Sequence, residues 1–208
     1  MGLVTAVNTL LLAVGPVFFL SRLWALPTFV LVGCSVLGAV AEVAQAALPL
    51  PLGLQDAAVP PALLAAALAV PALRKMPFLG GGGVVDSENR PRALAMGAAM
   101  GSSLVHLTAR VLGALGTPGF SWDAVVLAAL FNVALLKAFS IVALVDNGLR
   151  RGQVGVAVAV AVAVGAHFAG RAAAAAAGDA VAGLPPVFAE AAPRCVEAVA
   201  LFVAGRVL

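Results

Sequence analysis

The chain has 208 residues, of which 63% are hydrophobic and 10% are charged, and its mean hydropathy is +1.11. A soluble domain is about half apolar and about a quarter charged, so this composition excludes a soluble enzyme, a disordered chain and a nucleic-acid-binding protein. The 12 Lys and Arg residues face 9 Asp and Glu residues, and we interpret this small basic excess as membrane-topology charge rather than as a phosphate-binding patch.

Seven apolar segments follow one another along the chain, separated by short stretches that are polar or contain proline. A membrane-spanning helix needs about 20 mostly apolar residues, so seven helices would fill most of the chain and leave only short loops. We therefore expect an all-α polytopic membrane protein with seven transmembrane helices in a single domain over residues 1–208, embedded in a lipid bilayer. The segments cover residues 3–20, 27–48, 57–73, 93–115, 123–145, 154–177 and 185–207.

The basic residues predict the orientation of these segments. With the N-terminus lumenal or extracellular, eight basic residues fall in cytosolic loops and two fall on the opposite side, which is the positive-inside bias. The C-terminus is then cytosolic. The cytosolic set is Arg22, Arg74, Lys75, Arg90, Arg92, Arg150, Arg151 and Arg206, and the opposite set is Arg110 and Arg171.

Two regions of the first half of the chain carry recognisable patterns. The four glycines of residues 80–83 lie in a polar loop that lacks the Gly-Lys-Ser/Thr ending of a phosphate-binding loop, so we expect a flexible connection. Gly97 and Gly101 in the fourth segment lie on one helix face, where they allow two helix backbones to approach closely. Near the outer end of the same segment, His106 and Arg110 are one turn apart and predict an interfacial polar edge.

Ionisable residues inside the later segments are the candidate functional groups, because such groups are expensive in lipid. Lys137 in the fifth segment is expected to pair with Glu42 or Glu197, to snorkel, or to contact a partner helix. His167 in the sixth segment is expected to hydrogen-bond to a neighbouring helix. Its alternatives are a structural or gating role at a subunit boundary and metal ligation, for which no second ligand is evident.

The patterns of known intramembrane proteases are missing. An aspartyl site needs two carboxylates that share a proton, whereas Asp56, Asp123 and Asp146 lie at or beyond the predicted membrane interface. Neither histidine belongs to a His-Glu-x-x-His motif. We therefore expect no catalytic residue, no cofactor and no metal site in this chain.

Several short motifs, in order along nearly the whole chain, resemble the anterior-pharynx-defective-one (Aph-one) subunit family of γ-secretase. The first segment contains a Gly-Pro pair, the fourth contains glycines spaced by four and ends in a turn similar to Ala-Leu-Gly-Pro-Gly, and the fifth ends in an acidic and basic stretch. The sixth contains a Gly-x-His triplet. The matching stretches are residues 13–20, Gly97, Gly101, 114–119, 135–139, Asp146, Arg150, Arg151, 165–167 and 183–185.

The chain also departs from the family pattern. Val105 stands where the family has a third glycine of the helix-four series, and Lys137 stands where it has a histidine. The stretch between Asp146 and His167 is about one turn longer than in the family. With these differences, the chain resembles a divergent member of the family. The packing expected at Val105 and the polar contact expected at Lys137 differ from those of the family.

The resemblance implies a non-catalytic seven-helix scaffold. Family members assemble with presenilin, nicastrin and a small two- or three-helix subunit, and presenilin supplies the catalytic aspartates, so the scaffold supports intramembrane proteolysis as an endopeptidase activator. The implied location is the endoplasmic reticulum, the Golgi and other endomembranes, with the plasma membrane as a further site. On this basis Gly97 and Gly101 would seat a helix, and Lys137 and His167 would be satisfied within the bundle or at the presenilin boundary.

Two other functions stay open. One is the seven-helix subunit that partners nicalin and NOMO beside the translocon, which is also a non-catalytic scaffold of similar length. The other is a small transporter or channel, which would need an aqueous path lined by Lys137, His167 and Glu42 or internal repeats with broken helices. The two halves of the chain show no repeat, but prolines break segments at Pro16, Pro71 and Pro193.

Overall fold

The computed structural model describes residues 3–48, 51, 54–114, 122–176 and 186–207, and it is helical with no strand in those ranges. The all-α class expected from the sequence is therefore confirmed for the described residues. In chain order the helices are α1 (Leu3–Leu23), α2 (Thr28–Ala47), α3 (Leu54–Ala69), α4 (Pro71–Arg74), the 3-10 helix η1 (Pro77–Leu79), α5 (Asn89–Ala114), α6 (Trp122–Arg150), α7 (Gln153–Ala176) and α9 (Pro186–Val207).

The third predicted segment is interrupted at Pro71, one of the prolines that the sequence marks as breaking a segment. The sequence predicts one helix over residues 57–73, but α3 ends at Ala69 and the short α4 begins at Pro71. Val70 between them is extended, with φ −72° and ψ 120°. A residue that precedes proline is driven out of the helical region by a clash with the proline ring, so Pro71 explains the break.

Three of the helices are long and apolar enough to cross a membrane, by length and composition: Thr28–Gln45 of α2, Val125–Arg150 of α6 and Gln153–Ala176 of α7. Two shorter apolar helices cover Val7–Leu23 and Ala57–Ala69. The described part of the chain thus has the character of a membrane protein, with three candidate spans rather than the seven expected. Charged residues lower the hydropathy of the other two long helices, at Arg90 and Arg92 in α5 and at Arg194 and Glu197 in α9.

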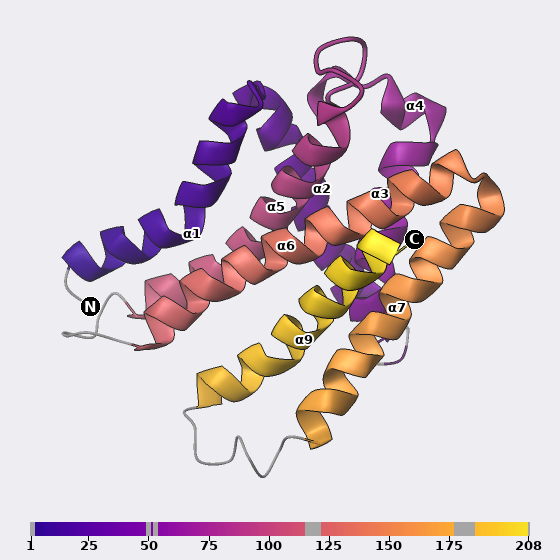
Figure 1. The fold of residues 1–208 in the computed structure, drawn as a ribbon. Helices are drawn as coiled ribbons and strands as arrows, with labels where there is room; N and C mark the ends of the chain where they lie inside the picture. The colour runs from indigo at the N-terminus through magenta and orange to yellow at the C-terminus, as the bar shows by residue number, and fades with distance from the viewer. Residues whose placement is uncertain (1–2, 49–50, 52–53, 115–121, 177–185, 208) are drawn as a thin grey trace.

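Helix α6 is the centre of the bundle (Figure 1). It contacts α1, α3, α5, α7 and α9, while α2 packs along α5 and α7 packs along α9. The largest fully buried side chains include Leu94 and Met96 of α5, Leu144 of α6 and Leu201 of α9. The core therefore lies between α6 and the two helix pairs, and the sites described below lie at those same boundaries.

Helix α1 bends midway along its length in Figure 1, and Pro16 lies inside it. Proline has no N–H and its ring pushes on the carbonyl four residues back, which here belongs to Leu12. The side-chain amide of Asn132 on α6 donates a hydrogen bond to that Leu12 carbonyl at 3.2 Å. A polar side chain of the central helix thus satisfies the backbone group that the proline leaves unpaired.

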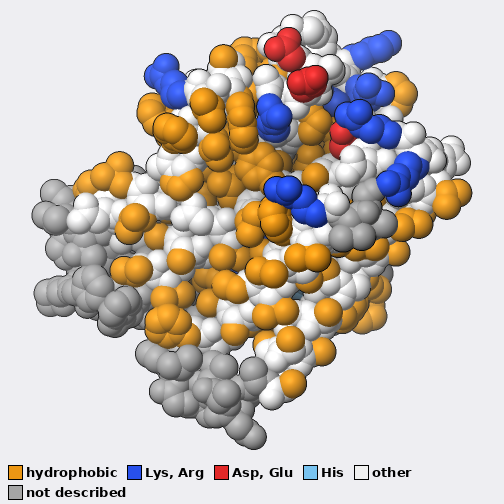
Figure 2. Space-filling view, in the orientation of Figure 1, with side chains coloured by type: hydrophobic (Ala, Val, Ile, Leu, Met, Phe, Trp, Pro, Cys, Tyr) orange, Lys and Arg blue, Asp and Glu red, His pale blue; other side chains and the backbone are white. Residues whose placement is uncertain are grey.

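Basic side chains gather at one end of the molecule. Figure 2 shows Lys and Arg side chains concentrated in the upper part of the view, around a stretch of hydrophobic side chains. That end holds the turn between α1 and α2, the loop before α5 and the turn between α6 and α7 (Figure 1). Its exposed basic residues are Arg22, Arg74, Lys75, Arg92, Arg150, Arg151 and Arg206.

Candidate functional site: a polar cavity between the helices

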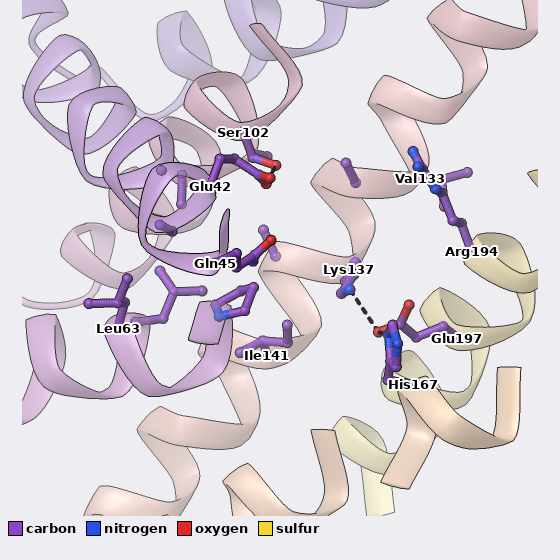
Figure 3. Close-up of a pocket in the computed structure, with 18 of the residues that line it drawn as sticks. Glu42, Gln45, Leu63, Ser102, Val133, Lys137, Ile141, His167, Arg194 and Glu197 are labelled. Carbon is purple, nitrogen blue, oxygen red and sulfur yellow. Dashed lines mark hydrogen bonds and ion pairs between the residues drawn. The ribbon is translucent and has the colours of Figure 1, made fainter. Parts of the chain in front are cut away.

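Lys137 and His167, the two ionisable residues singled out in the later segments, meet at one carboxylate. Lys137 Nζ lies 2.7 Å from Glu197 Oε1, and His167 Nδ1 lies 3.2 Å from the same oxygen (Figure 3). The three residues come from α6, α7 and α9, so their contacts join three helices at a single point. We call Lys137, His167 and Glu197 the Glu197 cluster.

The local sequence of α7 explains why its histidine faces this carboxylate. The buried residues of α7 recur at helical spacing, so they form one narrow face made of small side chains and a single histidine. At Gly170, a Cβ atom would lie 2.7 Å from the carbonyl oxygen of Pro193 on α9. The absence of that Cβ lets α7 approach α9 one turn from His167. The buried face comprises Ala159, Ala163, Ala166, His167 and Gly170.

Burial makes the pairing of these charges necessary. The Glu197 side chain is 6% exposed and the Lys137 side chain is 25% exposed. An ionised carboxylate in such surroundings is strongly penalised unless a cation and hydrogen-bond donors compensate it. Lys137 supplies the cation. His167 supplies a second donor, because a carboxylate only accepts hydrogen bonds and the facing Nδ1 must therefore carry the proton.

In a neutral imidazole, that assignment leaves the other ring nitrogen of His167 as an acceptor. His167 Nε2 is buried, and the structure gives it no hydrogen-bond partner. Buried polar atoms in native proteins are almost always paired with protein or with ordered water. His167 also lines a cavity, so its Nε2 offers one acceptor to a small polar group inside the bundle.

The cavity has a volume of about 290 Å³ and lies between α2, α3, α5, α6, α7 and α9. On the side opposite the Glu197 cluster, the Ser102 hydroxyl of α5 donates a hydrogen bond to Glu42 of α2. Figure 3 shows the Ser102–Glu42 pair and the Glu197 cluster on opposite sides of the cavity. The polar residues that line the cavity are Glu42, Gln45, Ser102, Lys137, His167, Arg194 and Glu197.

Gly97 and Gly101 lie beside this cavity, on the face of α5 that meets α2. A Cβ atom on Gly97 would overlap Cys34 of α2, and one on Gly101 would overlap the backbone of Ser35. The α2 side of this contact also depends on a glycine, because a Cβ atom added to Gly38 would overlap the backbone of Ala98 on α5. We call Gly97, Gly101 and Gly38, with the backbone that they meet, the glycine seam.

The other residues singled out in the sequence do not contribute to this site in the described part of the structure. Val105, which replaces the family's third glycine, is 45% exposed and lies off the glycine seam. The side chains of His106, Arg110, Asp56 and Asp123 lie outside the described residues, as do the turn at 115–119 and residues 183–185. In the ranges that the structure covers, no three His, Cys, Asp or Glu residues gather as a metal site would require.

Two functional contacts were missed from the sequence. Gly38 lies five residues after Gly33, the other glycine of α2, without the four-residue spacing that marked Gly97 and Gly101. Its close contact becomes visible only when α5 is packed against α2. The Asn132–Leu12 contact links residues 120 positions apart. Two features of the sequence could have indicated this contact. A proline inside one apolar segment leaves a backbone carbonyl unpaired, and an asparagine inside another apolar segment offers an amide donor.

Comparison of the chain with models of protein families, with curated proteins and with solved structures finds no match to any of them. Its function therefore has to be argued from its own residues and contacts.

Proposed function

We propose that this chain is a non-catalytic scaffold subunit of a membrane protein complex. The observation that carries the proposal is the Glu197 cluster, in which ionisable groups of three helices are paired with one another. Lys137 and His167 contact the same carboxylate oxygen, at 2.7 Å and 3.2 Å. Intramembrane polar contacts of this kind hold helices in fixed relative positions, which is what a scaffold must offer its partners.

The same proposal includes seven membrane crossings, with the N-terminus lumenal or extracellular and the C-terminus cytosolic. The gathering of basic side chains at one end supports this orientation, because cytosolic ends of membrane proteins are enriched in Lys and Arg. Helices α5 and α9 would then cross despite their charges. Glu197 of α9 is neutralised by its partners, and Arg90 and Arg92 lie at the very start of α5.

The partners that we propose are a presenilin-type protease, a nicastrin-type protein and a small helical subunit, and the proposed location is the endomembrane system. This assignment rests on the resemblance of the ordered motifs to the Aph-one family. The close approach of α2 and α5 at Gly97 and Gly101 supports it, because that pair belongs to the motif set. The replacement of the family histidine by Lys137 is balanced here by the carboxylate of Glu197.

Affinity purification of the tagged full chain in mild detergent, followed by mass spectrometry, tests this function. We expect presenilin and nicastrin in stoichiometric amounts. Recovery of nicalin and NOMO instead would keep the scaffold role but move the chain to the translocon-associated complex. Recovery of the chain without any stoichiometric partner would contradict both scaffold assignments.

A small transporter or channel is the second candidate, and one observation favours it. Lys137, His167 and Glu42 line one cavity, and His167 Nε2 in it has no hydrogen-bond partner. Polar groups around an intramembrane cavity are typical of substrate and ion pathways. Flux of a solute or of protons into liposomes that contain this chain alone, abolished by Glu197→Gln, would establish this function in place of the scaffold.

A further inference from the structure

A second cavity, of about 1260 Å³, opens at the basic end of the molecule. Five arginines line it, contributed by α4, α5, α6 and α9, although these residues are far apart in the sequence. The basic side chains in the upper part of Figure 2 belong to this end. Charge counting alone assigns such residues to membrane topology, but their convergence on one cavity suggests a bound anion. The five are Arg74, Arg90, Arg92, Arg150 and Arg206.

Arg90 differs from the other four because it is buried, with 9% of the residue exposed. One end of its guanidinium donates a hydrogen bond to the carbonyl of Ala67 at 2.8 Å. Its Nε is buried and has no hydrogen-bond partner in the structure. Burial, and then the positive charge of Arg74, lower the pKa of the Arg90 guanidinium. Arg90 lines the cavity, so its guanidinium adds a buried positive charge to the wall, and a negatively charged group in the cavity would stabilise it.

The acidic residues around this cavity do not balance the arginines. Among the described residues, Glu88 and Asp146 are the acidic ones that line it, and the Asp146 carboxylate is already paired with Arg150 at 3.1 Å. Two of the arginines are also positioned by aromatic rings, because Arg92 lies 5.1 Å from the ring centroid of Trp24 and Arg206 lies 5.1 Å from that of Phe202. The cavity therefore keeps a positive field with several preset donors.

One wall of the same cavity is apolar. Side chains of α1, of the turn that follows it, of α6 and of α9 form this wall. Phe202 and Leu136 are 44% and 39% exposed, so the wall is accessible. A cavity with cations at one end and an apolar wall behind them matches a phosphate group that carries a hydrocarbon chain. The wall residues are Leu20, Trp24, Leu136, Phe139 and Phe202.

We propose that this cavity binds the headgroup phosphate of an anionic phospholipid, with Arg90, Arg74 and Arg206 around the phosphate and an acyl chain along the wall at Phe139. Arginine is well suited to phosphate because its planar donors engage two oxygens at once. The cytosolic leaflet, which the proposed orientation places at this end, carries the anionic lipids that attract basic residues.

Lipid titration of the purified full chain tests the proposal, with thermal melting and native mass spectrometry as readouts. The probes are phosphatidate, phosphatidylcholine with the same acyl chains, and inorganic phosphate. Arg74→Gln/Arg206→Gln removes two exposed arginines of the cavity and leaves the buried Arg90, with its hydrogen bond to Ala67, in place. Arg22→Gln/Lys75→Gln is the matched control, because it removes two exposed charges at the same end outside the cavity.

We expect phosphatidate to raise the melting temperature and to remain bound in the mass spectrum, while phosphatidylcholine does neither. The cavity variant should weaken phosphatidate binding about tenfold for each arginine removed, because each arginine is proposed to make charge-assisted hydrogen bonds to the phosphate. The control variant should show only the smaller loss that comes from diffuse attraction. Equal losses in both variants would show diffuse surface attraction and would overturn the site. Full stabilisation by inorganic phosphate alone would keep a phosphate site but overturn the lipid assignment.

Discussion

The glycine seam and the Glu197 cluster join helices of one bundle in opposite ways. At the glycine seam, α2 and α5 meet backbone to backbone because Gly97, Gly101 and Gly38 have no side chains to separate them. At the Glu197 cluster, α6, α7 and α9 meet through charged groups around one carboxylate. The first junction should fail when volume is added, and the second should fail when one charge is removed.

The comparison matters because lipid weakens the usual reason for helices to associate. Hydrocarbon chains are as apolar as leucine, so close packing of small residues and polar contacts must hold a membrane bundle together. In this chain the central helix α6 takes part in the Glu197 cluster through Lys137, and it also contacts α5, which carries two glycines of the glycine seam. Both junctions border the cavity of about 290 Å³.

The largest effect is expected from Gly101→Leu in the glycine seam. Its side chain would overlap the Ser35 backbone, which cannot rotate away, so α2 and α5 must separate. Overpacking of this kind costs about 3 kcal/mol, measured as a loss of melting temperature and of monodisperse protein in detergent. Gly165→Leu on α7 is the matched control, because no heavy atom lies within 4 Å of the Cβ it adds. Equal loss in both variants would contradict the glycine seam.

The next effect is expected from Glu197→Leu in the Glu197 cluster. It removes the anion that Lys137 and His167 share, and because Lys137 is 25% exposed we expect a loss of about 2 kcal/mol, less than for a fully buried pair. Adding Lys137→Met should restore part of this stability, because the unpaired cation is gone. Thermal melting of both single variants and the double variant measures the coupling. A double variant no more stable than Glu197→Leu would contradict the charge pairing.

A smaller effect is expected where a polar contact lies inside the glycine seam. Ser102→Ala removes the hydroxyl that donates to Glu42 across the α2–α5 boundary, and a hydrogen bond to a charged group contributes about 1.5 kcal/mol. Ser35→Ala is the control, because the Ser35 hydroxyl donates to Leu31 of its own helix. If both serines lower the melting temperature by the same amount, the contact between helices does not stabilise the seam.

The smallest effect is expected at α1, which a neutral hydrogen bond helps to hold. Asn132→Ala leaves the Leu12 carbonyl without its donor from α6, and such contacts in membranes contribute about 0.6 kcal/mol. Hydrogen exchange should then speed up in α1 and stay unchanged in α5. Ser140→Ala, which removes a hydroxyl bonded only within α6, should leave both helices unchanged. Unaltered exchange in α1 of Asn132→Ala would show that packing alone holds it.

The sequence predicted local features well because apolar runs and small-residue spacing act within one helix. The all-α class followed from the seven apolar segments, and the spacing of Gly97 and Gly101 pointed to a close helix approach. Pro71 marked a possible break in the third segment, and the structure places that break at Val70, directly before the proline.

The contacts between helices were much less predictable. The sequence left Glu42 and Glu197 equally open as partners for Lys137, because both lie in apolar segments and only the packing of α6 against α9 decides between them. The burial of Arg90 was also missed. It lies in a charged stretch that resembles a solvated loop, yet it reaches the Ala67 carbonyl of α3.

The most direct test of the scaffold function compares the partners that co-purify with the wild-type chain, Gly97→Leu and Gly165→Leu. If the bundle is a scaffold whose shape depends on the glycine seam, presenilin and nicastrin will accompany the wild type and Gly165→Leu equally. They will be depleted with Gly97→Leu, whose added Cβ overlaps Cys34. Absence of any stoichiometric partner from the wild-type sample, with all three chains equally monodisperse, would contradict the scaffold function.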